Sequence, residues 1–325
     1  MSKALDVVMK SRKELTDEIV ENMKKGYIFT EKWDASMFQA HNGESNHVYQ
    51  GSNRLRLVFE QSKKGYKDNR WYTYLQIQKM GLKLKPSSKA TIIENWQFDR
   101  YEKITDKDGN TLLDDKGNEI LNKVHLSHPI VRYYNVFNGD QIEGLEPQKI
   151  PEIKDSDVFK TAEVLKNSSE CEIKELNQDE SYYSPDGDYI VLPPKECFKS
   201  DKDYITTLMH EMAHSTSNEN RLGRDIRNFF GTKDYAKEEL RAELSSYFMG
   251  ADLGINDLDT NINHSAYLNS WMQVLKDDPN ELFKACNEAS GISEYLIKNY
   301  NLEKEKEADK EEVLWLDFKK NISLL

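Results

Sequence analysis

Apolar residues recur at helical spacing over the first 25 residues of the chain. Intervals of three, four and seven place them on one face of a helix, and Gly26 follows where a helix commonly ends. This apolar face consists of Leu5, Val8, Leu15, Ile19 and Met23. The pattern therefore predicts an amphipathic helix over residues 3–25.

The rest of the first half predicts shorter elements. Thr73 is a residue type that begins helices and Gly81 one that ends them, so a short helix is expected between them. Strand patterns occupy 90–98 and 130–138. Between these strands, 106–121 contains two Asp/Gly-rich turns. They indicate a hairpin insertion and not a calcium loop, which would need a glycine and a glutamate that the segment lacks at the required positions.

The pattern changes after residues 146–156, a proline-containing stretch that we interpret as a linker. Beyond it, helices dominate and strands are few. Helices are predicted over 157–167, 200–217, 233–253, 263–277 and 279–299, and strands over 171–176 and 182–194. The charged stretch 302–312 is expected to be exposed or frayed. The sequence thus predicts an α+β protein with domains at 1–145 and 157–303 and a charged tail at 304–325.

Composition excludes some classes of protein. No apolar run reaches the roughly 18 residues that a membrane helix needs, and the N-terminus lacks the apolar core of a signal peptide. We therefore expect a cytoplasmic protein with no membrane partner. Cys171, Cys197 and Cys286 are far apart and odd in number, which argues against a disulfide framework and against a cysteine zinc site.

Charge is distributed unevenly along the chain. Residues 1–150 carry 24 Lys and Arg against 21 Asp and Glu, whereas residues 151–325 carry 21 against 36. The densest basic stretch, 54–89, holds ten Lys and Arg but only two acidic residues. The two halves of the chain are therefore expected to present different surfaces.

Aromatic residues are interleaved with the basic ones in this stretch. Cations contact phosphates and aromatic rings stack on unpaired bases, a mixture that suits single-stranded DNA better than duplex. A solvated lysine-rich surface over a core that contains the aromatics explains the composition equally well. The candidate DNA-contacting residues are Arg54, Arg56, Lys63, Lys64, Lys67, Arg70, Trp71, Tyr72, Tyr74, Lys83 and Lys85.

The segment "HEMAH" lies within a predicted helix. Residues four apart project from nearly the same face of a helix, so His210 and His214 can both bind one metal ion. Glu211 can then reach water on that ion without displacing a ligand, which is the arrangement of a general base. The alternative is a helix with two incidental histidines. The sequence favours a metal-dependent hydrolytic centre.

A third metal ligand is expected from the helix over 233–253, where the candidates are Glu238, Glu239, Glu243 and Asp252. Its acidic spacing resembles that of the gluzincin metallopeptidases, in which the first acid binds zinc. The resemblance assigns Glu239 as the third ligand and Glu243 as a hydrogen-bond partner of a ligand histidine, and the reverse assignment stays open. His264 or Tyr267 is a candidate for stabilising an oxyanion, although helix capping or packing is the favoured interpretation.

The order of motifs along the chain resembles the ArdC-type antirestriction family. The resemblance covers residues 10 to 298 and rests on "YQGSNRLRL", "YTYLQIQKMGLKLK", "YYSPDGDYIVLPP", "HEMAHST", "YAKEELRAEL" and "NHSAYLNSWMQVL". It implies a small mixed α/β domain that binds single-stranded DNA, followed by a zincin-like metallopeptidase domain. The entry segment "YIFTEKWDAS" and the 106–121 insertion depart from the family pattern.

The resemblance implies a function as well as a fold. It implies a mobile-element-encoded protein that protects single-stranded DNA from restriction, with zinc at the metal site, although manganese or cobalt also suits these ligands. A protein or peptide of unknown identity is the expected substrate. Two alternatives stay open, namely a DNA-coating protein with a structural or vestigial metal and a regulatory metalloprotease that cleaves a repressor-type partner.

Overall fold

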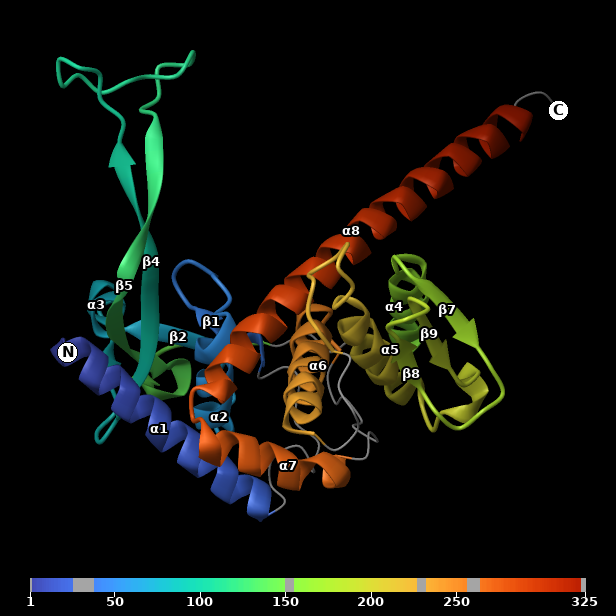
Figure 1. Ribbon diagram of the computed structural model, residues 1–325, viewed down its shortest axis with the longest axis horizontal. Coiled ribbons are helices and arrows are strands. Elements are labelled where there is room, and N and C mark those ends of the chain that lie inside the picture. The colour runs from blue at the N-terminus through green and yellow to red at the C-terminus, as the bar shows by residue number, and fades with distance from the viewer. Residues whose placement is uncertain (1, 26–37, 150–154, 227–231, 256–263, 323–325) are drawn as a thin grey trace.

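The computed structural model describes residues 2–25, 38–149, 155–226, 232–255 and 264–322 (Figure 1). In the first half, a four-stranded sheet has the order β1-β2-β5-β4. Its strands are β1 (His41–Asn42), β2 (Arg70–Thr73), β4 (Thr91–Lys103) and β5 (Leu121–Asn138). A separate pair joins β3 (Lys83–Leu84) to β6 (Ile142–Glu143). The helices of this half are α1 (Lys3–Lys24), α2 (Gly51–Lys64) and α3 (Tyr74–Lys79).

The predicted helices at 3–25 and after Thr73 are confirmed. Ser2 caps α1, and its hydroxyl accepts a hydrogen bond from the backbone N–H of Leu5 at 3.2 Å. Thr73 and Gln76 form a capping box at the start of α3, in which each side chain bonds the other residue's backbone. Helix α2 was not expected from the sequence pattern. It ends at Gly65, whose positive φ of 67° suits a residue without a β-carbon.

Strands β4 and β5 form a long antiparallel hairpin that projects from the body of the molecule (Figure 1). Both strands are longer than predicted. The insertion at 106–121 forms the tip, where Asp106 and Asp114 each accept a hydrogen bond from the backbone four residues on, at 2.9 and 2.8 Å. The predicted hairpin insertion is therefore confirmed.

The second half contains a three-stranded sheet in the order β7-β9-β8. Its strands are β7 (Glu172–Glu175), β8 (Tyr182–Ser184) and β9 (Tyr189–Leu192). The helices are α4 (Asp155–Asn167), α5 (Asp201–Ser215), α6 (Lys233–Asp252), α7 (His264–Asp277) and α8 (Glu281–Ile322). All five were predicted, although with different ends.

One prediction in this half was wrong and another was confirmed in part. A single strand was expected over 182–194, but 185–188 form a turn and the segment is a hairpin of β8 and β9. The stretch 302–312 was expected to be exposed or frayed. Most of its described side chains, up to Lys310, are exposed as predicted, but the stretch is not frayed, because it continues helix α8 without interruption. Glutamate and lysine are good helix formers, which explains why this charged segment stays helical.

One hydrophobic core spans both halves of the chain. Leu15 and Ile19 of α1 and Leu55 of α2 belong to the same buried cluster as Leu208 of α5 and Phe248 of α6. Helix α1 packs on α7, and α2 packs on α8. The division into two domains at residues 146–156 stays a prediction. The buried cluster contains residues from both sides of this segment. Among the described helices, none combines the length and apolar character that crossing a bilayer requires.

Candidate metal centre

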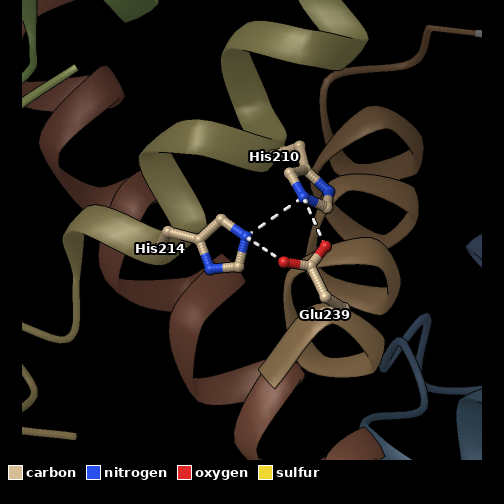
Figure 2. Close-up of side chains that lie close together, drawn as sticks. All are labelled: His210, His214 and Glu239. Atoms are coloured by element: carbon tan, nitrogen blue, oxygen red, sulfur yellow. Dashed lines mark hydrogen bonds and ion pairs between the residues drawn. The ribbon is translucent and has the colours of Figure 1, made fainter. Parts of the chain in front are cut away.

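Helices α5 and α6 bring the candidate metal ligands together. Ser200 caps α5, and Thr232 caps α6 through hydrogen bonds to backbone N–H groups at 3.1 and 3.2 Å. The two helices pack against each other, so His210 and His214 of α5 face Glu239 of α6. Figure 2 shows the three side chains converging on one point between the helices.

The distances among these side chains fit one bound ion. His210 Nε2 lies 3.1 Å from His214 Nε2 and 3.4 Å from Glu239 Oε2, and His214 Nε2 lies 3.6 Å from Glu239 Oε1. Ligands at ~2.0–2.1 Å in tetrahedral directions are separated by about 3.3 Å. Two imidazole nitrogens and a carboxylate are also the ligand set of many catalytic zinc sites. The residues therefore fit a divalent transition metal.

Two further carboxylates lie against the other ring nitrogens of the histidines. His214 Nδ1 is 3.3 Å from Glu238 Oε1, and His210 Nδ1 is 3.5 Å from Glu243 Oε2. A carboxylate beside Nδ1 favours the tautomer that carries the proton there. Nε2 of each ring is then left with a lone pair directed toward the common point.

The protonation of the centre reflects its burial and its charges. Burial alone would lower the pKa of His210, but the carboxylates of Glu239 and Glu243 outweigh it and raise the pKa well above its usual value. Burial would raise the pKa of Glu239, whereas His214 and His210 hold it at about 2. The carboxylate of Glu239 is therefore ionised, as a metal ligand must be.

Glu211 lies beside the ligand histidines and is buried. Burial raises the pKa of its carboxyl above the usual value, against the attraction of His210 and His214. The backbone N–H of Tyr183 in β8 donates a hydrogen bond to this carboxylate. A carboxylate with a raised pKa is better suited to accept a proton near neutral pH than an ordinary glutamate.

A cleft of about 800 Å³ opens onto the centre. Its floor includes His210, His214 and Glu239, together with Glu211. One wall comes from the β8–β9 hairpin, including Tyr182, which belongs to the edge strand of its sheet. An extended chain could pair with that edge while its backbone passes over the centre.

Three residues near the centre were not selected from the sequence. Tyr235 lines the cleft and hydrogen-bonds Glu239, and Glu238 and Arg224 lie behind His214. Glu238 was named only as one of four acids on its helix, since spacing does not show which carboxylate meets which ring nitrogen. The candidates His264 and Tyr267 lie in α7, but their side chains fall outside the described part of the chain.

Four of the candidate DNA-contacting side chains are buried. Trp71 and Arg54 are 0% exposed, Tyr72 is 3% exposed and Arg56 is 6% exposed. Trp71 belongs to a core cluster beneath the sheet, and Arg54 binds Asp252 of α6. The prediction that these four contact DNA is wrong for this structure, because their rings and guanidinium groups face the interior.

The remaining candidates lie at or near the surface. Lys63 pairs with Glu18, and Arg70 pairs with Asp68. The other five are exposed, and they are Lys64, Lys67, Tyr74, Lys83 and Lys85. Two of these residues come together at Asp140, whose side chain accepts from the backbone N–H of Lys67 and whose carbonyl accepts from Lys85 Nζ.

Comparisons with known proteins agree with the two halves of the chain. A family described as the N-terminal domain of anti-restriction factor ArdC matches residues 9–137. A family described as zincin-like metallopeptidase matches residues 160–288. Crystal structures of the antirestriction ArdC protein from plasmid R388, metal-free and Mn(II)-bound, are 29% and 30% identical, with TM-scores of 0.66 and 0.67. Each match covers 89% of this chain and 97% of that one.

Three further proteins are similar over most of this chain. Two from Escherichia coli named DNA primase TraC are 33% and 34% identical over 287 and 289 residues, or 87% of this chain. The chain spans only 19% and 27% of their lengths. An uncharacterized protein of Sinorhizobium fredii, y4eC, is 28% identical, and the match covers 78% of this chain and 80% of that protein.

Proposed function

Because the chain belongs to the ArdC-type antirestriction family, we propose that it is a mobile-element-encoded protein that binds single-stranded DNA and hydrolyses a peptide bond at its metal centre. The observation that carries the proposal is the convergence of His210, His214 and Glu239 beside Glu211 in one cleft. The biological task proposed is protection of incoming single-stranded DNA from restriction.

The residues divide the chemistry among themselves. A divalent ion held by the two histidines and Glu239 supplies Lewis-acid polarisation of a carbonyl and acidifies water. Glu211 accepts the proton of the attacking water and delivers it to the leaving amine. Strand β8 holds the substrate as an added strand.

The ion proposed is zinc, with manganese or cobalt as alternatives. Histidine and carboxylate ligands accept all three metals. The R388 relative is known in a Mn(II)-bound form, which favours a divalent transition metal in general over zinc in particular.

Replacement of a ligand histidine should empty the centre. We expect about one divalent transition-metal ion per purified wild-type chain and little or none in His210→Ala, because two remaining ligands bind a catalytic metal poorly. Elemental analysis of both proteins after removal of loosely bound metal measures this. Equal metal content in the two proteins would show that the ion binds elsewhere.

The DNA-binding part of the proposal is carried by the exposed residues of the basic stretch. Lys64, Lys67, Lys83 and Lys85 supply positive charge, and the ring of Tyr74 is 54% exposed and free to stack on a base. The proposed contact is electrostatic and independent of sequence.

Removing the four exposed lysines should weaken this contact. The variant Lys64→Gln, Lys67→Gln, Lys83→Gln and Lys85→Gln is expected to bind a single-stranded oligonucleotide less tightly. The slope of log K against log salt should fall in magnitude by about 0.7 for each lost phosphate contact, or about 2–3 in all. Fluorescence anisotropy over a salt series measures both quantities.

A variant with the same change in charge provides the control. Lys284, Lys298, Lys304 and Lys306 of α8 are exposed and lie outside the proposed DNA surface. Their replacement by glutamine should leave the salt slope unchanged. If both sets of substitutions lowered the slope equally, the contact would reflect overall charge and the proposed surface would be wrong.

A further inference from the structure

Arg224 connects the two helices that carry the metal ligands. Its guanidinium donates from Nη1 to Thr216 Oγ1 at 2.7 Å and from Nη2 to the carbonyl of Ala213 at 3.0 Å, both at the C-terminal end of α5. The same Nη2 lies 2.9 Å from Glu238 Oε1 of α6, and Nε lies 3.4 Å from Oε2. Arg224 and Glu238 are largely buried, with side chains 15% and 10% exposed.

The chain makes a specific turn to bring Arg224 to this place. After α5 it folds back on itself, with the N–H of Leu222 bonded to the carbonyl of Thr216 and the N–H of Arg224 to that of Ser217, both at 2.9 Å. Gly223 has a φ of 65°, a conformation that a residue with a side chain rarely adopts. The turn directs Arg224 under the last turn of α5 and toward α6.

Glu238 links Arg224 to the ligand histidine His214. One of its oxygens, Oε1, lies within contact distance of both Arg224 Nη2 and His214 Nδ1, at 2.9 and 3.3 Å. Both oxygens of the carboxylate face the guanidinium, Oε1 at 2.9 Å from Nη2 and Oε2 at 3.4 Å from Nε. Arg224 therefore holds the carboxylate of Glu238 in place, and His214 Nδ1 faces a fixed acceptor.

We propose that Arg224 is a positioning residue of the metal centre, which acts through Glu238 to fix the ring of His214 and the spacing of α5 and α6. This inference rests on the proposed function in one respect, namely that the centre binds a metal. The physical basis is that the guanidinium of Arg224 binds both the end of α5 and Glu238 of α6. These contacts restrict rotation of the His214 ring and movement of α6 relative to α5, so metal binding does not have to restrict them. The site is thereby organised before the ion arrives.

A purely structural role for Arg224 is the alternative, because a cation at the C-terminal end of a helix also stabilises that helix. Arg221 offers a matched control for this alternative. It lies in the same segment, donates from Nε to the carbonyl of Ser215 at 2.7 Å, and pairs with Asp188 of the β8–β9 turn. Arg221 thus caps the same helix end without contacting a carboxylate that meets a ligand histidine.

The test compares metal affinity and folding stability in four full-length proteins. Mn²⁺ and Zn²⁺ titrations are followed by calorimetry, and the metal-free proteins are compared by thermal melting. Arg224→Gln and Glu238→Gln should each lower the affinity for both ions by about 10–100-fold, as loss of a ligand's hydrogen-bond partner commonly does. Arg221→Gln should lower the melting temperature but keep the affinity of wild type within about twofold.

Two further measurements separate positioning from stability. Visible absorption of the Co²⁺-loaded proteins should change in Arg224→Gln and Glu238→Gln and stay the same in Arg221→Gln, because the spectrum reports the ligand geometry. The double variant Arg224→Gln and Glu238→Gln should bind Mn²⁺ about as weakly as either single variant, since the two residues act through one contact. If Arg224→Gln does not fold, the metal affinity of Glu238→Gln still tests the same contact.

The outcomes identify which claim fails. A wild-type chain that binds Mn²⁺ and Zn²⁺, with Arg224→Gln and Glu238→Gln binding equally well, overturns this inference and leaves the proposed function in place. A wild-type chain that takes up neither ion overturns both. Equal losses of affinity in the Arg224 and Arg221 variants would assign Arg224 a general structural role and end the inference.

Discussion

Glu211→Gln should lower peptide hydrolysis by about 10²–10⁴-fold, the contribution that general acid–base catalysis usually makes. The amide has nearly the shape of the carboxyl but accepts no proton at neutral pH. Glu211 makes no ligand contact in the cluster of His210, His214 and Glu239, so metal binding should survive. Burial raises the pKa of the Glu211 carboxyl because it disfavours the charged form. An uncharged amide at this position should therefore leave the fold intact.

The measurement has three parts in one preparation. Metal content, oligonucleotide affinity and antirestriction activity are compared in wild type and Glu211→Gln, with a peptide library as a source of substrates. Loss of protection with retained metal and DNA binding supports proteolysis as the mechanism. Full protection by the variant would instead support the alternative of a DNA-coating protein, and the role assigned to Glu211 would be wrong.

Arg54→Gln should destabilise the whole chain by about 3 kcal/mol, near the lower end for breaking a buried ion pair. The Arg54 side chain is 0% exposed and pairs with Asp252 at 2.7 Å, while Asp252 is 25% exposed. The guanidinium also donates to the carbonyls of Phe38 and Phe248 and stacks over the Phe248 ring. Glutamine cannot replace these contacts, so several buried acceptors lose their donor.

The consequence should extend beyond the first half of the chain. Arg54 lies on α2, whereas Asp252 ends α6, the helix that carries Glu239. Lys63→Gln on the same helix is the matched control, because Lys63 and Glu18 form a pair with 41% and 38% exposed side chains, worth about 0–1 kcal/mol. Chemical denaturation and thermal melting compare the two variants. Equal stabilities would contradict the assignment of Arg54 to the shared core.

The outcome for the basic stretch shows where sequence reasoning stops. From the sequence alone, Arg54 and Arg56 are interpreted as exposed charged residues. They interrupt the apolar pattern of α2, and the helix was therefore not predicted. Each arginine is buried against a partner distant in sequence, Asp252 for Arg54 and Ser11 for Arg56, although Nε of Arg56 has no hydrogen-bond partner among the described residues. Only their position in the fold distinguishes such arginines from the exposed Lys64 on the same helix.

The metal centre was predictable to a different extent. The spacing of His210 and His214 follows from helix geometry, because residues four apart share a face whatever surrounds them. The acidic residues of α6 were recognised as a group, but spacing alone cannot decide which of the four carboxylates lies at which ring nitrogen. The role of Arg224 could not be predicted from the sequence, because Arg224 belongs to no recognisable motif and a turn of the chain places it beside Glu238.

By itself, then, the order of residues determined what is local: most of the helices, the cap at Thr73, the hairpin of β4 and β5, and the position of His210 and His214 on one helical face. Hydrogen bonds and side-chain periodicity within a few residues are enough to specify such features. Tertiary structure alone decided which charges are buried, that Glu238 lies at Nδ1 of His214 and Glu243 at Nδ1 of His210, and that both halves share one core. These depend on distances between segments far apart in the chain, which only the packing of the helices brings within contact range.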